Sequence, residues 1–138
     1  MNRRLILAAP GLLAAPLIAR ASHADAEFLH HYRAWGQAKR DWYSLCDAPG
    51  HEYWDTPECQ DANRREYAAF DAMMAIRART MDGIAALAHV IWDASGPAFS
   101  RNWPGYDEEA NCPENQPKIA LWQSATGRDD HPPLFREK

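Results

Sequence analysis

The chain has 138 residues, a length that fits one domain with a modest hydrophobic core. Its formal net charge is −4, and its 25% charged and 46% hydrophobic residues are typical of a globular protein. Nucleic acids and anionic membranes are bound through basic surfaces that displace counterions, so this acidic composition argues against both as partners.

The N-terminus has the three parts of a cleavable export signal. Arg3 and Arg4 form a positive start, an apolar run follows over residues 5–18, and small residues suit a signal peptidase after Ala21 or Ala26. The run is shorter than the roughly 20 apolar residues of a transmembrane helix, so we expect no stable membrane span after cleavage. Paired arginines before an apolar run are typical of the twin-arginine translocation route.

Cleavage changes the charge and sets the compartment. The segment before Ser22 holds three of the 15 basic residues and none of the 19 acids, so its removal leaves a net charge of −7. We expect residues 1–26 to be the signal and the mature protein to be periplasmic or secreted.

The first helix is expected over residues 24–45, because large apolar side chains recur there at spacings of three, four or seven. These residues are Phe28, Tyr32, Trp35, Trp42 and Leu45. A loop follows, in which Pro49 and Gly50 indicate a turn. Thr56 and Pro57 then have the types preferred at the N-cap and at the first position of a helix.

The second helix is expected from Pro57 to about Arg77, with Asn63, Tyr67, Phe70 and Met74 along its buried face. Thr80 is a suitable N-cap for a third helix over residues 81–93, with Ile84, Leu87, Ala88 and Ile91 on its apolar face. One kinked rod is the alternative to two helices, but Gly83 and the Thr80 cap favour a break.

The C-terminal third contains many helix-breaking residues. Four prolines make residues 96–117 an expected irregular loop, followed by a short helix over residues 118–125 that ends at Gly127. No run alternates as a strand does. The prediction is therefore an all-α fold, either an antiparallel helical hairpin or a small three-helix bundle, over residues 27–126, with a flexible tail over residues 127–138. Because two helices bury little surface, a homodimer is also plausible.

The stretch from Ala78 to Ala86 contains an A-x-T-x-x-G pattern at Ala78, Thr80 and Gly83. Together with the Trp-bearing first helix, this pattern resembles a group of short, uncharacterised, often prophage-associated bacterial helical proteins. Leu87 departs from the group, in which many members have Lys. The resemblance implies a helical hairpin and no particular activity.

The chain has three cysteines, Cys46, Cys59 and Cys112. Cys46 and Cys59 lie at the two ends of the expected hairpin turn, so in an oxidising compartment they are the natural disulfide pair. A metal site is the alternative, since Cys46, His51, Cys59 and Cys112 supply three sulfurs and one imidazole. The spacing lacks the paired C-x2-C of structural zinc sites, so we expect no cofactor.

We find no catalytic motif and therefore expect a protein that is not an enzyme. The nearest approach to catalytic chemistry is His89 with Asp93, one helical turn apart, where a carboxylate could orient an imidazole in a small hydrolase.

Six tryptophans are unusual in so short a chain. We assign Trp35, Trp42 and Trp92 to the core. We expect Trp54 and Trp103, with Tyr53 and Tyr106, to form an aromatic face for a ligand or partner. The favoured function is a small exported binding or structural protein that contacts an unknown protein or small ligand. The alternatives are a metal- or cofactor-binding periplasmic protein and, third, a small hydrolase.

Overall fold

A computed structural model describes residues 24–51 and 53–136, so most of the expected signal lies outside the described residues. The described chain is helical with no strand, which confirms the all-α prediction. Its helices are α2 (Ala26–Cys46), α3 (Pro57–Met74), α4 (Met81–Ser95), α5 (Tyr106–Ala110) and α6 (Gln116–Thr126). None of these helices is long and apolar enough to cross a bilayer.

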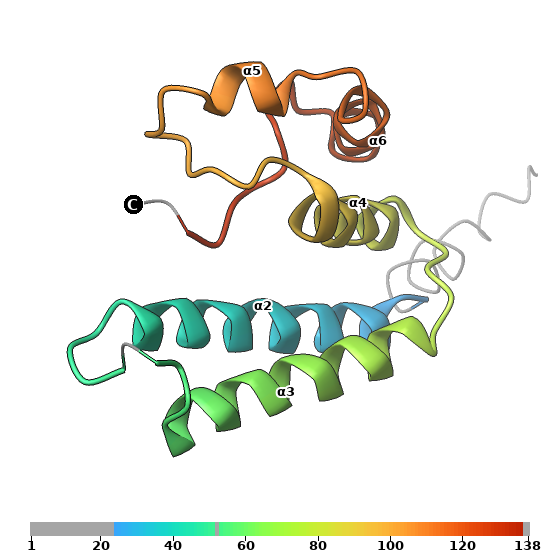
Figure 1. Ribbon diagram of the computed structural model, residues 1–138. Helices are drawn as coiled ribbons and strands as arrows, with labels where there is room; N and C mark the ends of the chain where they lie inside the picture. The colour runs from blue at the N-terminus through green and yellow to red at the C-terminus, as the bar shows by residue number, and fades with distance from the viewer. Residues whose placement is uncertain (1–23, 52, 137–138) are drawn as a thin grey trace, which may run out of the picture.

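The helices form two layers (Figure 1). The antiparallel hairpin of α2 and α3 makes one layer and has the most extensive helix–helix packing in the molecule. Helices α4 and α6 pack on each other in the second layer, beside the short α5, and α4 also contacts α2. A core of Phe28, Trp35, Met73 and Val90 joins the hairpin to α4.

Thr56, Thr80 and Gly127 set three helix ends as the sequence predicts, whereas α3 ends at Met74 rather than near Arg77 and α5 lies inside the expected loop over residues 96–117. The Thr56 hydroxyl accepts a hydrogen bond from the Cys59 amide at 3.4 Å, and the Thr80 hydroxyl accepts one from the Gly83 amide at 3.2 Å. Helices α3 and α4 are therefore separate. Gly127 ends α6 in a left-handed conformation with φ of 68°, which glycine adopts without strain.

The buried face of α3 differs from the predicted one. Tyr67 and Met74 are 62% and 42% exposed, whereas Ala62, Ala69 and Met73 are buried. Small side chains on the contact face let α3 approach α2 closely, so the large residues beside them turn outward. A count of large apolar residues could not reveal this choice.

The C-terminal segment, residues 131–135, packs against the helices instead of fraying. The Pro132 side chain is fully buried, Leu134 packs on the cluster around Trp92, and the Phe135 ring lies 5.1 Å from the Trp35 ring, centroid to centroid. The tail that was expected to be flexible over residues 127–138 is therefore packed over residues 131–135. Its few apolar side chains are buried, although the tail as a whole is polar in composition.

Candidate functional site

A cavity of about 390 Å³ lies between α2, α4 and the C-terminal segment. This volume is in the range of small-molecule binding sites. The cavity is lined by Tyr32, Arg33, Gly36, Arg40, His89, Pro133, Leu134 and Phe135. The lining combines apolar walls, two cations and one imidazole, and none of its described residues is acidic.

His89 lies in this lining and is only 3% exposed. Its Nδ1 is hydrogen-bonded to the Tyr32 hydroxyl at 2.6 Å. The other ring nitrogen, Nε2, has no hydrogen-bond partner of good geometry in the described chain, although the Pro133 backbone lies close enough to favour the protonated ring. When Tyr32 donates to Nδ1, Nε2 carries the proton and is a buried N–H group with almost no accessible surface.

The surroundings of His89 keep the ring uncharged. Its imidazole stacks on Phe135 with centroids 4.9 Å apart and meets Tyr32, Trp35 and Trp122 edge-on. Burial lowers the pKa of His89 to about 4, and the charges of Lys39 and Arg40 act in the same direction. The ring is therefore neutral near pH 7, which makes it a hydrogen-bonding group and a weak base.

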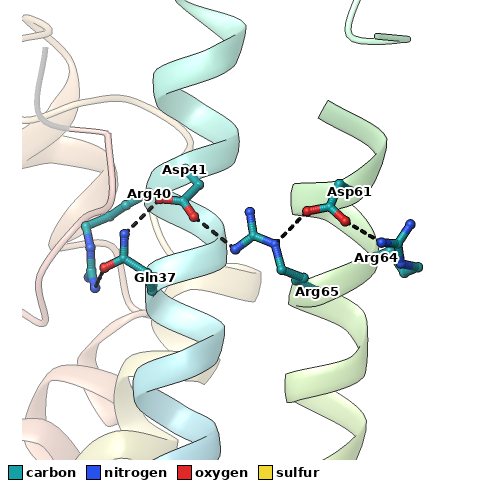
Figure 2. Close-up of polar contacts among 6 residues, drawn as sticks. All are labelled: Gln37, Arg40, Asp41, Asp61, Arg64 and Arg65. Atoms are coloured by element: carbon teal, nitrogen blue, oxygen red, sulfur yellow. Dashed lines mark hydrogen bonds and ion pairs between the residues drawn. The ribbon is translucent and has the colours of Figure 1, made fainter. Parts of the chain in front are cut away.

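Two arginines give the cavity its positive charge. Arg33 and Arg40 are two turns apart on α2 and so lie on the same side of the helix. The Arg40 guanidinium donates to the Gln37 side chain at 3.1 Å (Figure 2) and lies 5.9 Å from the centre of the Phe135 ring. These cations favour an anionic ligand.

Gly36 lies in the cavity lining where the C-terminal segment packs against α2. A Cβ atom at this position would lie 3.4 Å from the Phe135 ring and 3.5 Å from the Arg40 guanidinium. Glycine inside a helix normally costs stability. Both distances are ordinary van der Waals contacts, so an alanine would also fit here and packing does not require the glycine.

The expected pairing of His89 with Asp93 does not form. Asp93 instead accepts a hydrogen bond from Lys39 at 2.5 Å, while Tyr32 occupies the Nδ1 atom of His89. Lys39 also pairs with Glu66 at 3.4 Å, and all three side chains are less than one-fifth exposed. The carboxylate is neutralised between α2, α3 and α4, so the hydrolase-like arrangement is absent.

The expected aromatic face is only partly exposed. Tyr53, Trp54 and Trp103 are 87%, 57% and 58% exposed, whereas Tyr106 is 4% exposed and packs with Trp92. Trp54 lies against Trp42 with ring centroids 5.7 Å apart.

Trp103 stacks on Phe99 with ring centroids 5.6 Å apart. Phe99 and Tyr43 line a second cavity of about 180 Å³, which shares Leu134 and Phe135 with the first cavity. The face is thus two separate aromatic pairs, with no ring contact between Trp54 and Trp103 in the described chain.

The structure brings Cys46 and Cys59 together but not the fourth member of the predicted metal set. All three cysteines are free thiols. Burial and the neighbouring Cys59 raise the pKa of Cys46, and His51 Nδ1 lies 3.6 Å from the Cys59 sulfur. Cys112 lies apart, between α5 and α6. Among the described residues no three His, Cys, Asp or Glu side chains form a metal-binding group, so the proposed zinc ligands are not assembled.

A third hollow, of about 590 Å³, opens between the end of α2 and the start of α3. Arg65 spans its wall, donating to Asp41 and Asp61 at 2.9 Å each (Figure 2). Arg64 also pairs with Asp61, and Gln37 donates to Asp41 at 2.7 Å (Figure 2). These charges already satisfy one another at the surface, so this hollow has less to offer a ligand than the His89 cavity.

Sequence reasoning missed most of the cavity, including Tyr32, Arg33, Arg40 and Phe135. Tyr32 and His89 are 57 residues apart in the chain, so no local sequence pattern could predict their contact. The available signal was Gly36, a helix-weakening residue in an otherwise regular helix. No protein-family model, curated protein or solved structure matches the chain, so the assignment of the site depends on its geometry.

Proposed function

We propose that this protein is a small exported binding protein whose His89 cavity holds an organic monocarboxylate with an apolar body. The observation that carries the proposal is the pair of cations, Arg33 and Arg40, in a lining that has no acid among the described residues. Arginine is well suited to carboxylates because its planar donors match their geometry.

The apolar wall sets the rest of the ligand. Phe135 and Leu134 offer hydrophobic surface opposite the arginines, and Tyr32 adds an aromatic ring. An aromatic or branched acid of modest size would place its carboxylate at the guanidinium groups and its apolar body along this wall. A neutral analogue of the same shape would lose the charge-assisted hydrogen bonds.

Binding is favoured over catalysis by the chemistry of the lining. Among the residues that the structure describes, the lining has no serine, threonine, cysteine, lysine or carboxylate that could act as a nucleophile or a strong general base. His89 is held neutral with a pKa of about 4, which makes it a poor proton acceptor at neutral pH.

Export supports the same proposal. The N-terminal pattern is typical of proteins exported to the periplasm or outside the cell, by the twin-arginine or the general route. In that oxidising compartment Cys46 and Cys59 would form a disulfide, and the compartment's disulfide oxidant would accept the two electrons and two protons released. The bond would close the turn between α2 and α3.

The test is a calorimetric titration of the protein with benzoate, phenylacetate and 1-naphthoate, each compared with its neutral amide. We expect the acids to bind more tightly than the amides. Arg33→Gln and Arg40→Gln should each weaken binding about tenfold, the effect of losing one charge-assisted hydrogen bond.

Arg77→Gln is the matched control, because Arg77 is exposed and lies outside the cavity lining. It should leave the affinity unchanged. Acids and amides that bind equally, an equal loss in the Arg77 variant, or no binding at millimolar concentrations would contradict the proposed ligand class.

A further inference from the structure

Asp25 is a buried carboxylate immediately before α2, with only 2% of its surface exposed. Its side chain accepts hydrogen bonds from the backbone amides of Arg79, at 2.9 and 3.0 Å, and Thr80, at 2.7 Å. The Thr80 hydroxyl donates a further bond at 2.5 Å. Asp25 therefore ties the start of α2 to the connection between α3 and α4.

The charged form of Asp25 is the one that the fold accommodates. Burial alone would raise the pKa of Asp25, but the hydrogen bonds from Thr80 and Arg79 lower it below its ordinary value. The Asp25 backbone carbonyl also accepts the Leu29 amide at 2.8 Å and so begins the α2 hydrogen-bond ladder. One residue thus serves both the helix and a distant loop.

The residues of the A-x-T-x-x-G pattern surround the Asp25 carboxylate. Thr80 donates its hydroxyl proton to Asp25 and accepts the Gly83 amide, so it links the carboxylate to the first turn of α4. A Cβ atom at position 83 would lie 2.2 Å from Asp25 Oδ2 and 3.0 Å from the Ala78 Cβ. Only glycine leaves room for Asp25 here.

We propose that the export signal is removed after Ala21 and not after Ala26, so that Asp25 stays in the mature protein. The inference rests on the proposed export, and it does not depend on the ligand. Both positions satisfy the small-residue rule of signal peptidase. Cleavage after Ala26 would remove Asp25 and leave the Arg79 and Thr80 amides without their acceptor, whereas cleavage after Ala21 leaves the anchor intact.

The first arm of the test compares chains made without a signal, starting at Ser22, Ala24 or Glu27. Urea unfolding followed by circular dichroism gives the folded-to-unfolded ratio of each. We expect the Ser22 and Ala24 chains to be alike and the Glu27 chain to have a ratio at least 30-fold lower, since several charge-assisted hydrogen bonds are lost. Asp25→Asn in the Ser22 chain isolates the side chain and should lower the ratio at least tenfold. Asp82→Asn changes an exposed acid at a variable position of the pattern and should have little effect.

The second arm is the intact mass of the exported protein. A chain that begins at Ser22 supports the proposal, and one that begins at Glu27 overturns it. A full-length chain would refute the proposed export itself, while the first arm would still measure the role of Asp25. Equal stability of the Ser22 and Glu27 chains would remove the physical reason for preferring Ala21.

Discussion

The imidazole of His89 shows how one buried residue sets a property of the whole protein. Aromatic rings surround it, Tyr32 holds one nitrogen, and its pKa is lowered to about 4 by burial. An ordinary histidine has a pKa of about 6.5. Below pH 6.5 the His89 imidazole therefore binds a proton in the unfolded chain but stays neutral in the folded chain.

This difference predicts a loss of stability in mild acid. Between pH 6.5 and about 4 the unfolded state binds more protons, so the free energy of unfolding falls as the pH falls through this window. The shift corresponds to about 3 kcal/mol. Urea unfolding at half-unit steps from pH 7 to pH 4 measures this loss.

His89→Gln provides the comparison, because glutamine keeps hydrogen-bonding atoms and does not titrate. Its unfolding free energy should vary much less over the same window. The lowered pKa values of Asp25, Asp41 and Asp130 matter mainly below their ordinary value of 3.8 and so outside the window. The pKa of the exposed Glu114 is lowered from 4.5, so its contribution begins to be lost inside the window, equally in the parent and the variant. A Gln variant as pH-sensitive as the parent would show that another group is responsible.

At the scale of the helices, the Lys39 ammonium forms ion pairs that connect α2 to α3 and α4. It binds Asp93 of α4 and Glu66 of α3 from α2, and its ammonium lies 5.6 Å from the centre of the Trp35 ring. Burial lowers the pKa of Lys39, but the two carboxylates outweigh burial and the net shift is upward. The lysine is therefore charged at all physiological pH values.

Removal of this lysine should be costly, because it leaves two poorly solvated carboxylates facing each other. We expect Lys39→Met to lower the free energy of unfolding by about 3 kcal/mol. Adding Asp93→Asn and Glu66→Gln to the same variant should recover part of the loss, since the repulsion is then gone. Denaturant titration of the single and triple variants checks both statements. A triple variant less stable than the single one would contradict this account.

Cys46 and Cys59, at the turn between α2 and α3, are predicted to form a disulfide on oxidation. Treatment of the folded protein with oxidised glutathione should link Cys46 to Cys59 and lower the intact mass by about 2 Da, the mass of the two hydrogens lost. Cys112 should remain a separate thiol. Cys46→Ser should abolish the intramolecular bond. Peptide mapping that finds Cys112 in the bond would contradict the pairing.

At the scale of the whole molecule, the C-terminal segment lines the His89 cavity and the neighbouring cavity beside Phe99. Leu134 and Phe135 line each of them, and Pro132 is buried beneath. Removal of residues 131–138 should lower the free energy of unfolding by about 3 kcal/mol and abolish carboxylate binding. A red shift of tryptophan fluorescence should accompany it, as Trp35 loses its cover.

Arg136→Gln is the matched control for this truncation. It breaks the ion pair with Asp47 at 3.0 Å, which a largely exposed arginine makes at the surface. Such pairs contribute less than about 1 kcal/mol. A truncated protein as stable as the Arg136 variant would mean that the segment is not packed in solution.

Local rules accounted for much of the helical architecture. Thr56, Thr80 and Gly127 marked helix ends because capping depends on neighbouring residues alone. The buried face of α3, the packed C-terminal segment and the pairing of Tyr32 with His89 escaped prediction, because each depends on contacts between distant positions. The A-x-T-x-x-G pattern was visible in the sequence, but its physical reason lies in Asp25.

The C-terminal segment also implies an order of assembly. Helices α2 and α3 are neighbours in sequence, so their hairpin can form early, whereas Phe135 reaches Trp35 only after a much longer loop closes. The wall of the His89 cavity is therefore expected to form late in folding and to open first in unfolding. A ligand bound behind this wall would slow the first step of unfolding and so lower the unfolding rate of the native protein.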